Sequence, residues 1–318
     1  MRTGYLLFLL FPTALFSLLL FPSDALSWGP GVHAMISSSL IGGDFLPFIS
    51  KLITSFQKEF IWGSLMADMM IGKNLSNWKF HPHNWEFIFK IFENAKSDNI
   101  RSFMIGYMTH LSHDIVAHNF LVPEIALFSS LEKNNIVGEK NLVHFKIEVN
   151  AERLVPLDVW KKIKEVQDAK ESRVCSEFLE ENLQKGFLTP KVSGAIYRRT
   201  IKINAFKEFI KSKIAFRLNG NTADPHKAVL LKLTRGYVDM AYKLSENFLK
   251  KFNRSICLKM DPTGTEAISV SFSMVGAIRE VKNRKGDVSV DKFFKALGQF
   301  QPSIFGNKTP VLETLKIS

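Results

Sequence analysis

The chain contains little cysteine, with only Cys175 and Cys257 among its 318 residues. This scarcity excludes a disulfide-dense scaffold, and neither cysteine has a partner at metal-ligand spacing. The pair leaves two alternatives open: one disulfide that closes a long loop, or two buried free thiols. The sequence also lacks a Gly-rich phosphate loop of the Walker type, so nucleoside triphosphate chemistry has no support. It shows no convincing strand alternation, internal repeat or low-complexity linker, which favours a helical fold.

Long apolar runs are scarce as well, because residues 5–21 form the single run that approaches the length of a membrane span. Small residues follow it at Ala25 and Ser27, where a signal peptidase would cut. We predict a signal peptide over 1–27, and hence a secreted or periplasmic protein whose first residue is Trp28. We favour cleavage over an uncleaved membrane anchor. Cleavage would matter chemically, since a free α-amino group beside a carbonyl oxygen can chelate a metal.

Histidine is concentrated in one region, since seven of the eight histidines lie between positions 33 and 144. Residues 104–118 have the apolar spacing of a helix, and within them His110, Asp114 and His118 stand four residues apart. Residues i and i+4 share a helix face, so these side chains should form one stripe. Two imidazoles can hold two metals if the carboxylate between them bridges. A buried Asp114 needs a cation or hydrogen-bond donors, because an unpaired carboxylate in a core is costly.

Further candidate ligands accompany this stripe. His144 and Glu148 repeat the four-residue step, and Asp68 falls near the end of a predicted helix. His81 and His83 compete for one role, and the proline between them predicts an extended segment whose two imidazoles point to opposite sides. Only one of the two can then face a metal. Singly, each residue also fits an ordinary role as a cap, an ion pair or a surface group, and the joint spacing is what favours metal.

This set resembles the zinc-dependent phospholipase C family, which shares a trinuclear zinc fold with the single-strand-specific nucleases. The nine ligands that the resemblance implies are Trp28, His33 and Asp114 at one zinc, Asp68, His83, His110 and Asp114 at a second, and His118, His144 and Glu148 at a third. It also implies that Asp68 is catalytic, orienting or deprotonating the attacking water. His81 and His113 would then support the ligands or lie at the surface.

The resemblance implies an all-α, multi-helix bundle with a zinc cluster of up to three ions. The expected activity is phospholipase C-type hydrolysis of phospholipids by a water that the metal activates. The short step from Asp114 to His118 resembles the glycosylphosphatidylinositol-specific phospholipase D branch. The spacing from Trp28 to His33 instead resembles the nucleases, so a single-strand nuclease or 3′-nucleotidase is one alternative. A zinc-stabilised binding protein without turnover is another.

The second half of the chain predicts further helices and carries most of the positive charge. The predicted helices cover 157–170, 172–185, 191–218, 225–252, 266–282 and 290–300. We assign 28–250 to the phospholipase C-like domain and 251–318 to a helical C-terminal extension. Residues 151–318 contain 31 Lys+Arg against 18 Asp+Glu, whereas 1–150 contain 11 against 12. This asymmetry fits phospholipid headgroups, an anionic membrane surface or, under the nuclease alternative, nucleic acid. A solvated basic surface, which is common, is the other explanation.

Overall fold

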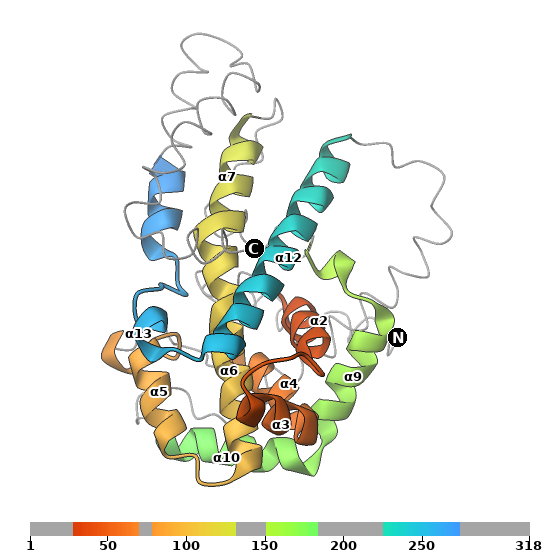
Figure 1. Cartoon of the computed structure of the whole chain (residues 1–318). Helices are drawn as coiled ribbons and strands as arrows, with labels where there is room; N and C mark the ends of the chain where they lie inside the picture. The colour runs from red at the N-terminus through yellow and green to blue at the C-terminus, as the bar shows by residue number, and fades with distance from the viewer. Residues whose placement is uncertain (1–27, 70–77, 132–150, 184–224, 274–318) are drawn as a thin grey trace, which may run out of the picture.

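The computed structural model describes residues 28–69, 78–131, 151–183 and 225–273 (Figure 1). Within these ranges every regular element is a helix, which confirms the predicted all-α fold class. Several predicted features lie outside the described residues. They are the signal peptide 1–27, the ligands His144 and Glu148, and the helices over 191–218 and 290–300.

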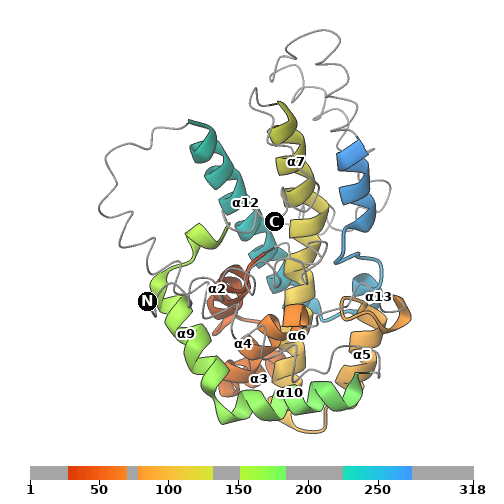
Figure 2. The same ribbon diagram turned by 180° about the vertical axis from the view of Figure 1, so that it is seen from behind.

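The bundle is built around one central helix. α6 (Asp98–Val116) runs through the middle of the molecule and continues through a π-helical turn, η5 (Ala117–Leu121), into α7 (Val122–Leu131). The other labelled α-helices are α2 (Pro30–Leu40), α3 (Pro47–Ser55), α4 (Gln57–Met66), α5 (Trp85–Glu93), α9 (Leu157–Asp168), α10 (Lys170–Asn182), α12 (Pro225–Lys251) and α13 (Arg254–Cys257), and residues 265–273 are also helical. In Figure 1 and in the reverse view of Figure 2, α2, α4 and α9 lie on one side of α6, and α5 and α13 lie on the other.

Four predicted helices are present with shifted ends. The helix predicted over 104–118 is confirmed as α6, but it begins earlier, at Asp98, and regular α-helix stops at Val116. The helices predicted over 157–170, 172–185 and 225–252 correspond to α9, α10 and α12. The helix predicted over 266–282 is helical as far as the description reaches, at residue 273. Helix ends depend on tertiary contacts more than on periodicity, which explains shifts of a few residues.

The contact between α4 and α6 positions the rest of the bundle. A Cβ atom built on Gly63 would lie 1.9 Å from the carbonyl oxygen of Phe103, and one on Gly106 would lie 1.9 Å from that of Phe60. The two helices therefore approach so closely that only glycine fits at their crossing. This brings the turn after α4, where Asp68 lies, next to the last turns of α6.

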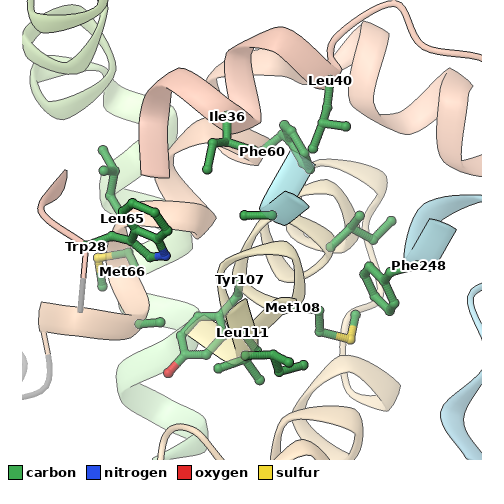
Figure 3. Packing of buried hydrophobic residues seen from close by; sticks show 14 of the residues in the cluster. Trp28, Ile36, Leu40, Phe60, Leu65, Met66, Tyr107, Met108, Leu111 and Phe248 are labelled. Atoms are coloured by element: carbon green, nitrogen blue, oxygen red, sulfur yellow. The ribbon is translucent and has the colours of Figure 1, made fainter. Parts of the chain in front are cut away.

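A single hydrophobic core surrounds this crossing. From Glu59 onward α4 is buried on all sides, and so is the second half of α6, as expected for helices without a polar face. Figure 3 shows side chains of α2, α4, α6 and α12 in this core, with the indole of Trp28 among them. The labelled core residues are Trp28, Ile36, Leu40, Phe60, Leu65, Met66, Tyr107, Met108, Leu111 and Phe248.

The two cysteines are free thiols, each buried in the core, so the disulfide alternative is not realised. Burial raises the pKa of both Cys175 and Cys257 to about 12, and both therefore stay protonated at neutral pH. Among the described helices, none combines the length and the apolar character that crossing a membrane requires.

Candidate metal centre

Four of the predicted ligands come together in the core. Asp68, His83, His110 and Asp114 each offer a ligand atom, and these four atoms all lie within 4.8 Å of one another. This is the set that the family resemblance implies for the second zinc. His83 Nε2 lies 2.9 Å and His110 Nε2 lies 3.0 Å from Oδ2 of Asp114. The same two nitrogens lie 3.7 Å and 3.6 Å from Oδ1 of Asp68.

Local structure explains how these side chains meet. Asp68 lies in η2 (Ala67–Met69), a single 3₁₀ turn that ends α4. His110 and Asp114 are one turn apart on α6, so their side chains face the same way. His83 precedes α5, which begins after Asn84, whose side chain accepts hydrogen bonds from the first free N–H groups of that helix.

His33 approaches the same two carboxylates from α2. Its Nε2 lies 3.6 Å from Oδ1 of Asp114 and 3.8 Å from Oδ2 of Asp68, and its ring stacks on His110 at 3.9 Å. Each carboxylate therefore presents one oxygen to His33 and the other to His83 and His110. A carboxylate in this position can bridge two cations, one on each side. Asp68 thus has the same two-sided position as Asp114, the residue for which alone the sequence predicts a bridging role.

The two remaining predicted ligands in the described ranges, Trp28 and His118, are buried beside this cluster. Trp28 is fully buried, and its indole N–H donates to the carbonyl of His113 over 3.1 Å, next to Asp114 in the chain. His118 is also buried and lies within electrostatic reach of His33 and Asp114. With His144 and Glu148 outside the described residues, His118 is the one described member of the third predicted zinc set.

The outer nitrogens of two histidines face carbonyl oxygens, which fixes their tautomers. His110 Nδ1 lies 2.7 Å from the carbonyl oxygen of Ser64, and His118 Nδ1 lies 2.6 Å from that of Pro262. A carbonyl only accepts, so Nδ1 carries hydrogen in both rings and donates it. Nε2 is then the nitrogen that can bind a metal, and the carbonyl holds the ring in place. His33 Nδ1 lies 3.0 Å from Nδ1 of His113, which makes His113 the corresponding support for His33.

The electrostatics of the metal-free cluster favour a cation. Burial alone would raise the pKa of Asp114, but His110 and the hydrogen bonds from His110 and His83 hold it well below its ordinary value. Burial lowers the pKa of His110, yet the carboxylates of Asp114 and Asp68 outweigh this and raise it to about 10. Burial and the neighbouring charge of His110 lower the pKa of His33 to about 3, so its ring is neutral. One buried proton on His110 therefore occupies the position between two carboxylates that a metal ion would take.

His83 rather than His81 reaches the two carboxylates, but the segment between them is not extended. It is a turn, closed by a hydrogen bond of 2.8 Å from the Asn84 N–H to the His81 carbonyl, and the two rings lie 5.6 Å apart. The extended conformation predicted from Pro82 is therefore wrong, because the residue before a proline can also open a turn. His81 Nδ1 accepts from the backbone N–H of His83 over 3.1 Å and thereby supports the ligand candidate.

Two supporting side chains lack any sequence signal. The buried hydroxyl of Tyr107 donates to the Pro82 carbonyl over 3.1 Å and so holds the turn that carries His83. The buried carboxylate of Glu152 accepts from the N–H of Val32 over 3.2 Å at the start of α2. A Cβ atom on Gly29 would lie 2.1 Å from Glu152 Oε1. Both contacts join residues far apart in the chain, so neither spacing nor periodicity could reveal them.

The donor set fits zinc, which favours imidazole and carboxylate ligands in buried sites. A family model described as zinc dependent phospholipase C matches residues 32–214, more than half of the chain. The chain belongs to the zinc-dependent phospholipase C family. It is therefore a zinc-dependent phosphodiester hydrolase, and membership in this family implies a phospholipid substrate. No curated protein and no solved structure matches the chain.

Proposed function

We propose that the protein is exported and hydrolyses phospholipids as a phospholipase C, at the cluster around Asp68 and Asp114. The observation that carries this proposal is the pair of buried carboxylates, each placed between His33 on one side and His83 and His110 on the other. Buried carboxylates need cations or hydrogen-bond donors, and a pair of adjacent cations would suit the negative charge of a phosphodiester.

These positions and the family resemblance support the following ligand roles. His83 and His110 would hold one zinc with both carboxylates, and His33 would hold a second with the terminal amino group and carbonyl oxygen of Trp28. His118 would hold a third with His144 and Glu148. When bound, zinc neutralises the phosphodiester and activates water as the nucleophile.

Backbone carbonyls of the protein position the ligand imidazoles, and a side chain accepts a proton from the attacking water. The carbonyls of Ser64 and Pro262 hold the rings of His110 and His118, which keeps their Nε2 atoms aimed inward. Asp68 lies in a single 3₁₀ turn, and its carboxylate oxygens face both sides of the cluster. We assign it the role of orienting the attacking water and accepting its proton.

Maturation at Trp28 is part of the proposal. The burial of Trp28 and its hydrogen bond to the carbonyl of His113 support it, because they anchor this residue against α6 next to Asp114. N-terminal sequencing of the exported protein should begin with Trp28. A variant that retains one extra residue before Trp28 should bind less zinc, since its amide nitrogen chelates poorly; full zinc binding by that variant would exclude the amino-terminal ligand.

The division into a domain over 28–250 and an extension over 251–318 remains a prediction. We further propose that the basic half of the chain, 151–318, attracts the enzyme to anionic membrane surfaces. Salt should then weaken its binding to anionic vesicles more than its binding to neutral ones.

A side-by-side assay tests the proposed substrate. Mature protein with zinc restored would be offered phosphatidylcholine, phosphatidylinositol and single-stranded DNA, with Asp114→Asn as the matched inactive control. We expect diacylglycerol from at least one lipid and none from the control. Cleavage of DNA without a lipid product would assign the protein to the nuclease alternative. Full zinc binding without turnover on any of the three would instead indicate the non-catalytic alternative.

A further inference from the structure

We infer that the turn formed by residues 261–264 positions His118 for zinc, so that a segment outside the family-matched range completes the metal centre. The family match ends at residue 214, and the turn follows α12 and α13. The inference rests on the proposed ligand role of His118. It concerns what holds this imidazole in place, which neither the family match nor the ligand pattern addresses.

His118 needs such support because α6 does not fix it. Regular α-helix ends at Val116, and His118 lies in the π-helical turn Ala117–Leu121. A π turn shifts the helical register, so His118 does not simply continue the stripe of His110 and Asp114. Its direction must therefore be set by contacts from elsewhere in the fold.

Three contacts from the turn supply that direction. The carbonyl of Pro262 accepts a hydrogen bond from His118 Nδ1 over 2.6 Å, which leaves Nε2 as the ligand nitrogen. The neighbouring carbonyl, of Asp261, accepts from the side-chain amide of Asn119 over 2.7 Å. Gly264 packs on the backbone of His118, where an added Cβ would lie 2.5 Å from the carbonyl oxygen of His118.

The turn itself is well defined. Oδ1 of Asp261 accepts from the backbone N–H of Thr263 over 2.8 Å and from its hydroxyl over 2.7 Å, which makes an Asx turn. Gly264 has a φ of 55°, a conformation that side-chain-bearing residues rarely adopt. The direction of the Pro262 carbonyl is therefore set by the turn itself and not by its hydrogen bond to His118.

The approach to the turn is held against α5. Arg254 of α13 forms an ion pair of 2.7 Å with Glu93 at the end of α5, and its guanidinium lies over the ring of Phe89. The segment is therefore held at α5 at its start and at His118 at its end. It therefore links the end of α5 to the candidate ligand His118.

Zinc affinity tests this inference without relying on turnover. Each variant would compete for zinc against a chromophoric chelator. The wild type gives the full number of zinc sites, and His118→Ala shows how the titration changes when one site is lost. Gly264→Ala forces a strained φ and a clash with His118, and Asp261→Ala removes the Asx turn. We expect both variants to lower the affinity of one zinc site by roughly tenfold to 100-fold, the usual effect of removing a group that orients a ligand. Neither should cause further loss in the His118→Ala background.

Two matched variants separate positioning from general damage. Gly42 also has a positive φ, 87°, but no atom lies within 4 Å of an added Cβ, so Gly42→Ala imposes backbone strain away from the site. It should keep the zinc affinity of the wild type. Asp261→Asn retains the acceptor oxygen and should restore what Asp261→Ala loses. If Gly264→Ala does not fold, the zinc affinities of Asp261→Ala and Asp261→Asn still test the positioning role.

The outcomes distinguish this inference from the proposed ligand set. Wild-type zinc affinity in both Gly264→Ala and Asp261→Ala, with one zinc lost in His118→Ala, would overturn the positioning role alone. Equal zinc binding by the wild type and His118→Ala would show that His118 is not a ligand, and would overturn both.

Discussion

Replacing Gly106 by alanine tests the crossing of α4 and α6 on which the metal centre is built. The added methyl group would lie 1.9 Å from the carbonyl oxygen of Phe60, whereas real contacts of this kind essentially never fall below 3.0 Å. The helices would have to separate by about 1 Å, because backbone on both sides leaves no side chain to rotate away. The same shift would pull the carbonyl of Ser64 away from His110 Nδ1, which it now meets at 2.7 Å.

The expected cost follows from two opposing effects. Overpacking a core costs about 1–3 kcal/mol of stability. A clash with backbone should cost about 3 kcal/mol, the upper end of this range, because backbone cannot move aside as a side chain can. Alanine is favoured over glycine inside a helix by about 1 kcal/mol, which offsets part of this. We therefore expect Gly106→Ala to lower the free energy of unfolding by about 2 kcal/mol. Gly236→Ala is the matched control: Gly236 is also inside a helix, α12, but nothing lies within 4 Å of an added Cβ.

Urea unfolding of the metal-free protein measures both variants. Gly236→Ala should be more stable than the wild type by about 1 kcal/mol, and Gly106→Ala less stable by about 2 kcal/mol. Gly106→Ala should also bind zinc more weakly. If Gly106→Ala proved as stable as Gly236→Ala, the close crossing of α4 and α6 would be incorrect, and with it the explanation of how Asp68 reaches Asp114.

Three further predictions concern the metal centre. His83→Ala should lose a zinc and the activity with it, whereas His81→Ala should keep most of both, because His81 contacts the ligand candidate and not the carboxylates; the reverse pattern in zinc analysis would exchange their roles. Gly29→Ala should lower zinc affinity by clashing with Glu152, and Glu152→Ala should relieve that clash in the double variant; additive losses would contradict this contact. At pH 8, zinc binding should release a proton, because the pKa of His110 is about 10 without metal and this ring must lose its proton to bind. Zinc affinity should accordingly fall as the pH is lowered, and calorimetry in buffers of different ionisation enthalpy would show whether the proton is released.

The all-α class and the core of the candidate site could be predicted from the sequence, because both depend on short-range periodicity. A four-residue step places His110 and Asp114 on one face of a helix wherever that helix lies, and their side chains do meet at 3.0 Å. The inclusion of Asp68 and His83 required the family resemblance, since nothing in their spacing alone shows that they meet. The ends of α6 and the turn at His83 were missed, because tertiary contacts override local preference at such places.

Only the tertiary structure decided what holds the ligand candidates in place. The supports are backbone carbonyls of Ser64 and Pro262, the hydroxyl of Tyr107 and the carboxylate of Glu152, each far along the chain from the group that it holds. Every residue has a carbonyl, so a carbonyl that orients an imidazole leaves no mark in composition, spacing or charge. Which carbonyl does so is determined by how the helices cross, and that depends on the packing of the whole core.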